Sequence, residues 1–78
     1  MVYCNLLSAE GSKLIYAIGG STDDITGKLV INLEDRSYDI IKEPERTKVY
    51  ARHISSMVGR AWNRFEKGIY PERLSYEI

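Results

Sequence analysis

The sequence has little of the chemistry that disulfide-stabilised domains, metal sites and membrane spans require. It contains one cysteine, Cys4, and one histidine, His53. An intramolecular disulfide is therefore excluded, and no paired ligands stand at a spacing typical of zinc sites. No apolar run approaches the roughly 20 residues that cross a bilayer, and no secretory signal pattern opens the chain. Because small secreted domains usually depend on disulfides, we expect a soluble, cytoplasmic protein.

Net charge is absent as well, since 11 Lys and Arg residues balance 11 Asp and Glu residues. The hydrophobic share of 44% and the charged share of 28% are close to the averages of folded soluble domains. This composition excludes a disordered tail. A length of 78 residues allows one small domain, which we divide into a sheet over residues 1–45, a helix over 46–68 and a tail over 69–78.

Residues 1–45 show the pattern of short strands separated by turns. The clearest segment is 28–34, in which Leu29, Ile31 and Leu33 alternate with polar or exposed positions. Each connection is too short for a parallel crossover, so the pattern predicts an antiparallel meander of about four strands. The expected strands are Val2–Leu7, Lys13–Ile18, Lys28–Glu34 and Tyr38–Lys42.

The loop between the second and third expected strands is long for a hairpin. Ser21 and Asp24 stand at capping-box spacing, which predicts one helical turn that Gly27 would close. The neighbouring pair Asp23 and Asp24 lacks the carboxylate spacing of a calcium loop, so we interpret both as solvated turn acids. The glycines of this loop also miss the phosphate-loop spacing, because six residues rather than four separate Gly20 from Gly27.

The hydrophobic period changes to that of an amphipathic helix over residues 46–67. Pro44 and the acids beside it favour a helix start near residue 46, with Thr47 as a second candidate cap. Gly68 and Pro71 predict the end of the helix. The apolar positions at three- and four-residue spacing are Tyr50, Ile54, Met57, Val58, Ala61, Trp62 and Phe65.

The C-terminal segment alternates Leu74, Tyr76 and Ile78 with polar residues. It is either a strand at an exposed sheet edge or a loosely docked end, and we favour the strand. The expected fold class is therefore α+β: an antiparallel β-meander packed on one face by a single long C-terminal amphipathic helix, with a short fifth strand at the C-terminus. Because so small a domain buries a limited core, we also expect a homodimer.

The chain contains few residues that are candidates for catalysis. Cys4 and His53 are the only natural nucleophile and base, but Cys4 lies in an expected core strand, where cysteine behaves as a small apolar residue. His53 falls on the predicted polar side of the helix, where we expect it to be solvated. We therefore predict no catalytic residue, no cofactor, no metal and no small-molecule substrate.

Charge is distributed unevenly along the chain. Residues 1–45 carry four cations against eight acids, and residues 46–78 carry seven cations against three acids, so the zero total conceals a dipolar molecule. On the expected helix, Lys48, Arg52, Arg60 and Arg64 follow a four-residue period together with Ser56. Such a row is either an ordinary solvated face, a contact for an acidic protein, or a contact for a phosphate backbone.

Tyrosine is the second departure from average composition, with six residues against one phenylalanine. Tyrosine combines apolar area with a hydroxyl group and is enriched at interfaces. We expect Tyr70 and Tyr76 to flank the helix exit beside Trp62 and Phe65, where they form either an interaction patch or the wet edge of the core.

These observations favour a small non-enzymatic protein-interaction module, and self-association is one form of that activity. The candidate binding surface comprises Lys48, Arg52, Arg60, Arg64, Tyr70 and Tyr76. The alternative function is nucleic-acid binding, in which the basic face of the helix contacts the phosphate backbone. No membrane partner is expected.

Overall fold

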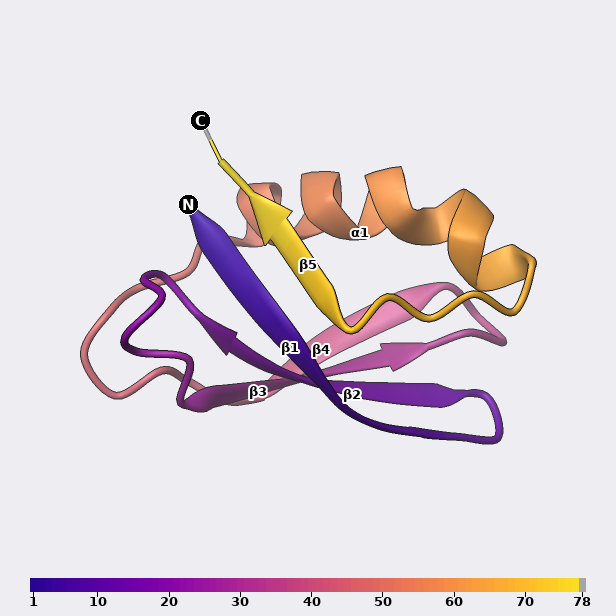
Figure 1. Cartoon of the computed structure of the whole chain (residues 1–78), viewed down its shortest axis with the longest axis horizontal. Coiled ribbons are helices and arrows are strands. Elements are labelled where there is room, and N and C mark those ends of the chain that lie inside the picture. Colours follow the sequence, from indigo (N-terminus) through magenta and orange to yellow (C-terminus); the bar gives the residue numbers. More distant parts are fainter. Residues whose placement is uncertain (78) are drawn as a thin grey trace.

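Alternating apolar side chains in the first half of the chain build an antiparallel sheet, and the amphipathic segment that follows packs on one face of it (Figure 1). The computed structural model describes residues 1–77. The sheet has five strands in the order β4-β3-β2-β1-β5. The elements are β1 (Val2–Glu10), β2 (Lys13–Gly19), β3 (Gly27–Asn32), β4 (Ser37–Lys42), α1 (Ala51–Glu66) and β5 (Arg73–Tyr76). The predicted α+β class is confirmed.

Two tight connections set the register of the meander. Gly11, with φ of 57°, turns β1 into β2, and Arg36, with φ of 58°, lies in the connection between β3 and β4. The predicted hairpin over residues 28–42 is present, with Leu29 paired to Ile40 and Ile31 to Tyr38. An irregularity in the β1–β2 pairing, near Leu7, adds one residue to β1, and another in the β3–β4 pairing, near Ile41, adds one residue to β4; each increases the local twist.

The tail forms the predicted fifth strand. β5 pairs antiparallel with β1, with Val2 opposite Tyr76 and Cys4 opposite Leu74. This pairing brings the two ends of the described chain side by side (Figure 1). The strand is shorter than the alternating pattern that predicted it, and the last alternating residue, Ile78, lies outside the described residues.

The core lies between the sheet and α1. Inward side chains from β1, β2, β3 and β5 pack against one face of the helix, and Tyr16 is buried among them with its hydroxyl donating to the Pro71 carbonyl at 2.7 Å. That bond satisfies the polar atom of a buried ring. The buried apolar residues are Val2, Cys4, Leu14, Tyr16, Ile18, Leu29, Ile31, Ile54, Met57, Val58, Ala61, Phe65 and Leu74.

The helix begins five residues later than predicted, at Ala51 rather than at residue 46. Thr47 does not cap it, because the Arg46 and Thr47 backbone N–H groups donate to the Asp24 carboxylate and residues 47–50 form no regular element. Tyr50 occupies the N-cap position without a side-chain cap.

The helical turn predicted at Ser21–Asp24, in the loop between β2 and β3, is also wrong. The Asp24 N–H donates to the Ser21 carbonyl in a simple turn.

The helix ends where Gly68 predicts. Gly68 has φ of 77°, its N–H donates to the Phe65 carbonyl, and the Ile69 N–H donates to the Arg64 carbonyl, which is the Schellman arrangement. Within residues 1–77, no helix has the length and apolar character needed to cross a membrane.

Candidate functional site

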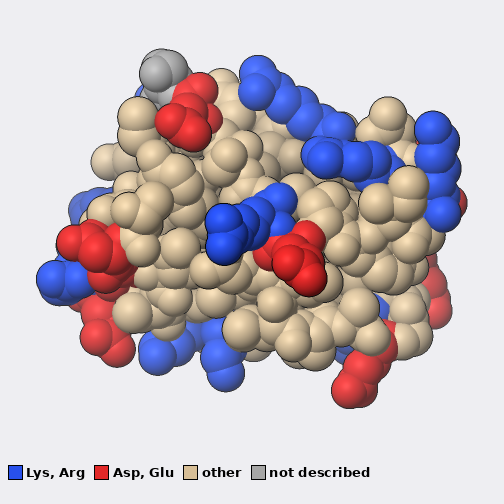
Figure 2. All heavy atoms as spheres, viewed as in Figure 1, with Lys and Arg blue, Asp and Glu red and all other residues tan. Residues whose placement is uncertain are grey.

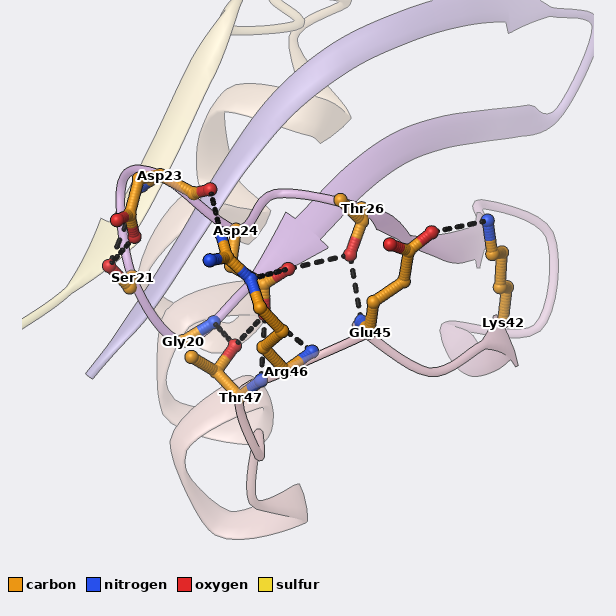
Figure 3. Close-up of polar contacts among 9 residues, drawn as sticks. All are labelled: Gly20, Ser21, Asp23, Asp24, Thr26, Lys42, Glu45, Arg46 and Thr47. Atoms are coloured by element: carbon orange, nitrogen blue, oxygen red, sulfur yellow. Dashed lines mark hydrogen bonds and ion pairs between the residues drawn. The ribbon is translucent and has the colours of Figure 1, made fainter.

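Asp24 is the most extensively bonded charged side chain of the molecule (Figure 3). Its side chain is only 1% exposed. One oxygen accepts from Thr26 Oγ1 at 2.9 Å, and the other accepts from the Arg46 N–H at 3.0 Å, the Thr47 N–H at 2.7 Å and Thr47 Oγ1 at 2.7 Å. These contacts join the β2–β3 loop to the segment before α1. We call Asp24, Thr26, Arg46 and Thr47 the Asp24 cluster.

The threonine hydroxyls of the Asp24 cluster also accept hydrogen bonds from neighbouring backbone N–H groups. Thr26 Oγ1 accepts from the Glu45 N–H at 2.8 Å, and Thr47 Oγ1 accepts from the Gly20 N–H at 2.9 Å (Figure 3). The Thr47 and Thr26 hydroxyls and the two backbone donors outweigh desolvation and lower the pKa of Asp24 to about 2. The expectation of a solvated acid is therefore wrong for Asp24, although Asp23 is exposed as expected. The cluster holds two loops together.

His53 is buried rather than solvated, with 8% of its side chain exposed. Its ring stacks on Tyr76 at 5.4 Å between centroids and meets Tyr50 edge-on at 5.5 Å. Pairing of β5 with β1 places Tyr76 over the flank of α1 that carries His53, which is the reason the prediction failed. Desolvation lowers the pKa of His53, with smaller effects from the N-terminal ammonium and Arg52. Its Nδ1 has no hydrogen-bond partner among the described residues.

Cys4 occupies the core, as predicted. It is 1% exposed, and its Sγ lies 3.9 Å from the sulfur of Met57. Burial raises the pKa of the thiol to about 12, so the thiol stays protonated at neutral pH and is a poor nucleophile.

The predicted basic row is only partly one surface. Arg52, Arg60 and Arg64 are exposed on α1, whereas Lys48 precedes the helix and is no longer part of a helical row. We call these three arginines the cationic face. Figure 2 shows Lys and Arg side chains along the upper edge, where α1 lies in Figure 1.

None of the cations on the cationic face forms an ion pair with an acid among residues 1–77. The ion pairs in this part of the chain are Arg36–Glu66, Lys42–Glu45 and Arg46–Asp24. Arg60 instead lies 5.0 Å from the ring centroid of Tyr76, a cation–π contact that leaves its charge uncompensated. The arginines therefore do not serve to neutralise the acidic turns of the same molecule.

The two C-terminal tyrosines do not form one patch. Tyr76 lies against His53 and Arg60, towards the start of α1. Tyr70 follows the helix end and packs on the edge of the core. Trp62 and Phe65 contact each other at 5.6 Å, and Trp62 lies beneath Arg36. The predicted grouping fails because β5 runs back along the helix and carries Tyr76 away from its exit.

A residue that sequence reasoning missed lies on α1 beside the cationic face. Gly59 is exposed in α1, and a side chain added there would meet nothing within 4 Å. Glycine in an exposed helix interior costs about 1 kcal/mol relative to alanine, and no contact within the described residues requires it. The nearby Ser56 also has a small side chain, and its hydroxyl donates to the Arg52 carbonyl at 3.0 Å. With Gly59 and Ser56 so small, only the arginine side chains project far from this part of the helix. The position of Gly59 inside a predicted helix was the available signal.

Among the described residues, no group of three His, Cys, Asp or Glu side chains could hold a metal ion. Comparisons of the chain with protein-family models, with curated proteins and with solved structures find no match.

Proposed function

We propose that this chain is a non-enzymatic protein-interaction module that binds an acidic surface of a partner protein through the cationic face of α1. The observation that carries the proposal is the absence of an intramolecular ion pair at Arg52, Arg60 and Arg64 within the described residues. Other cations of the described chain also lack an ion pair, but these three arginines are exposed together on one helix.

The shape of the cationic face supports a protein partner. Arg52 and Arg64 are separated by about 18 Å along the helix axis at 1.5 Å per residue, which matches about three turns of a partner helix. Gly59 and Ser56 lie between them and allow the backbone of a partner to approach closely. Arginine at the rim of an interface contributes orientation and association rate through its charge.

Nucleic-acid binding is the alternative, because a row of arginines also suits a phosphate backbone. Aromatic stacking gives it little support. Among the sheet tyrosines, Tyr16 is buried, and Tyr38 packs towards the core with its hydroxyl donating to the Ala51 carbonyl at 3.3 Å. Tyr3 is half-buried on β1. The ring of Tyr76 already contacts His53 and Arg60. A base-stacking platform needs two or three open rings, so an interaction with nucleic acid would depend on phosphate contacts.

A binding assay with defined probes tests the proposal. Fluorescence anisotropy is measured with a labelled Glu-rich peptide, a Gln-rich peptide of equal length, and random-sequence single- and double-stranded oligonucleotides, at several salt concentrations. We expect the Glu-rich peptide to bind at low salt and the Gln-rich peptide not to bind. Arg52→Glu combined with Arg60→Glu should weaken binding of the Glu-rich peptide at least tenfold by charge repulsion.

The matched control is Lys13→Glu combined with Lys28→Glu, which makes the same change in net charge on the sheet and should retain binding. Oligonucleotide binding that exceeds peptide binding and falls steeply with salt would establish the alternative instead. Absence of binding to every probe at low salt would refute both functions of this surface.

A further inference from the structure

The edge strand β4 contributes no residue to the fully buried core, which is built from β1, β2, β3, β5 and α1. Its two side chains that face the helix layer, Tyr38 and Ile40, are only partly buried. Within residues 1–77, the backbone of β4 pairs with no strand other than β3, so one row of its N–H and C=O groups faces away from the sheet. An open row of this kind can pair with another strand.

A groove of about 360 Å³ lies beside β4, between its helix-facing side and the start of α1. Ala51 and Ile54 line it from the helix, and Val49 lines it from the segment before the helix. The Tyr38 hydroxyl donates to the Ala51 carbonyl at 3.3 Å and joins β4 to the helix start at this groove. The rest of the lining comes from β4 and the residue after it: Tyr38, Asp39, Ile40 and Glu43. The groove therefore offers apolar surface to a side chain that approaches this edge of the sheet.

The charged residues that line this groove are both acids. Neither Asp39 nor Glu43 forms an ion pair within the described residues. Of the cations nearby in the chain, Lys42 pairs with Glu45 at 4.0 Å, and Lys48 lines a separate hollow before α1. The groove therefore favours a cationic partner, in contrast to the cationic face of α1.

We propose that β4 binds an extended, basic segment of a partner protein by strand addition. Alternation on β4 places Asp39 on the face away from the helix and its two neighbours on the helix side. A strand added to this edge continues that alternation, because opposite residues on neighbouring strands share a face. The segment therefore carries a lysine or arginine opposite Asp39 and an apolar residue on either side of that cation, one of which enters the groove. Main-chain hydrogen bonds to β4 supply the affinity, and these side chains supply the selectivity.

The irregularity near Ile41 limits the length of the segment that can pair. Regular pairing with β3 extends from Ser37 to Ile40, and Ile41, which is 57% exposed, interrupts it, so the added strand is short. A second copy of β4 fits this edge poorly, because centring the two strands on each other sets Asp39 opposite Asp39. Binding of a basic segment goes beyond the proposed binding of an acidic surface and uses a different part of the molecule.

Fluorescence anisotropy with two labelled peptides of the same composition tests this proposal. One peptide alternates lysine and valine, and the other carries its lysines in one block followed by its valines in another. We expect the alternating peptide to bind at least tenfold more tightly than the block peptide, because only alternation matches β4. Equal affinity for the two peptides would show that net charge alone drives binding and would overturn strand addition.

Substitutions at the edge and in the groove give a second test. Asp39→Lys should weaken binding of the alternating peptide at least tenfold, because it sets a lysine opposite a lysine of the added strand. Glu10→Lys makes the same change of charge at an exposed position of β1; it is the matched control and should retain binding. Ala51→Trp, which fills the groove from the exposed first residue of α1, should also weaken binding. Circular dichroism establishes that each variant is folded.

Amide hydrogen exchange locates the added strand. The N–H groups of β4 that face away from β3 should exchange at least tenfold more slowly when the alternating peptide is bound, and those of α1 should change little. A wild-type chain that does not bind the alternating peptide, binding that is unaffected by Asp39→Lys and Ala51→Trp in folded protein, or saturating peptide that leaves exchange on β4 unchanged would overturn the proposal.

The same peptides separate this inference from the proposed function. Arg52→Glu combined with Arg60→Glu should leave binding of the alternating peptide as tight as in wild type, because the cationic face takes no part in it. A chain that binds the Glu-rich peptide but not the alternating peptide would overturn strand addition and leave the proposed function intact.

Discussion

The Asp24 cluster and the cationic face of α1 use charge in opposite ways. Asp24 is 1% exposed and accepts four hydrogen bonds that join two distant loops. Arg52, Arg60 and Arg64 are exposed and have no acidic partner in the described chain. One charged side chain is buried in contacts that join parts of the fold, and three others make no ion pair within the described residues, which is the basis of the proposed binding to an external partner. Substitutions at the two regions should therefore have opposite effects on stability and on binding.

Asp24→Asn should have the largest effect on stability. The amide keeps one oxygen acceptor but turns an NH₂ group towards backbone and hydroxyl donors, which leaves buried donors unsatisfied. We expect the melting temperature to fall by about 10 °C or more, given the small unfolding entropy of a domain of this size. Thermal unfolding followed by circular dichroism measures the change. Asp23→Asn is the control, and an equal loss in that exposed neighbour would contradict the special position of Asp24.

The Asp24 cluster should also make the stability of the folded chain depend on pH in the acid range. The pKa of Asp24 is lowered from 3.8 to about 2 in the folded chain, so the unfolded chain binds the proton more readily. The stabilisation is fully present above pH 3.8 and is lost as the pH falls towards 2. Urea unfolding across this window should show a steeper decline for wild type than for Asp24→Asn. Parallel declines would mean that other carboxylates account for the acid sensitivity.

These outcomes bear on what could be predicted from the sequence. The strands, the fifth strand and the end of α1 were predictable because alternation, Gly68 and Pro71 are local signals. The start of α1 was not, because Asp24 captures the N–H groups of Arg46 and Thr47 from 22 and 23 positions away. No local pattern distinguishes Asp24 from Asp23 before the two loops are brought together.

The candidate surface was predictable to a similar extent. The periodic spacing of Arg52, Arg60 and Arg64 identified the exposed row, because helical period is a local property. Lys48 was included only because the helix start was placed too early. His53 and Tyr76 were placed in solvent and at the helix exit, since their contact depends on the pairing of β5 with β1.

His53→Phe should give a smaller change that depends on pH. The folded chain lowers the pKa of His53 below 6.5, so wild-type stability should decrease as the pH falls from neutral to about 5, where the unfolded chain takes up the proton. Phenylalanine can retain stacking with Tyr76 but cannot titrate. Denaturant unfolding of the variant should therefore show a flatter profile over this range. If the unfolding free energy of the variant depended on pH as steeply as that of wild type, a group other than His53 would be responsible for the pH dependence.

Gly59→Ala should stabilise the chain by about 0.5–1 kcal/mol, because alanine favours the helix and open space surrounds the added methyl group. The same variant should weaken binding of the Glu-rich peptide if a partner approaches the helix closely at this point. Chemical denaturation and anisotropy on one preparation measure both effects. A stabilised variant with unchanged binding would remove Gly59 from the contact surface.

Arg52→Glu combined with Arg60→Glu should have only a small effect on stability, no larger than that of Gly59→Ala. Only the cation–π contact of Arg60 with Tyr76 is lost, and an exposed contact of this kind contributes about 0.5–1 kcal/mol. Urea unfolding measures the change. A much larger loss would show that these arginines stabilise the fold, as Asp24 does, and would end the contrast between the two regions.

The most direct measurement is an amide chemical-shift titration of the ¹⁵N-labelled chain with the Glu-rich peptide at low salt. Binding by the cationic face predicts that the largest shifts lie along α1 between Arg52 and Arg64 and that they disappear as salt is added. Residues of the Asp24 cluster should hardly move. Saturating peptide that shifts no residue of α1, or shifts that lie on the strands of the sheet instead, would contradict the assignment of this surface to an acidic partner.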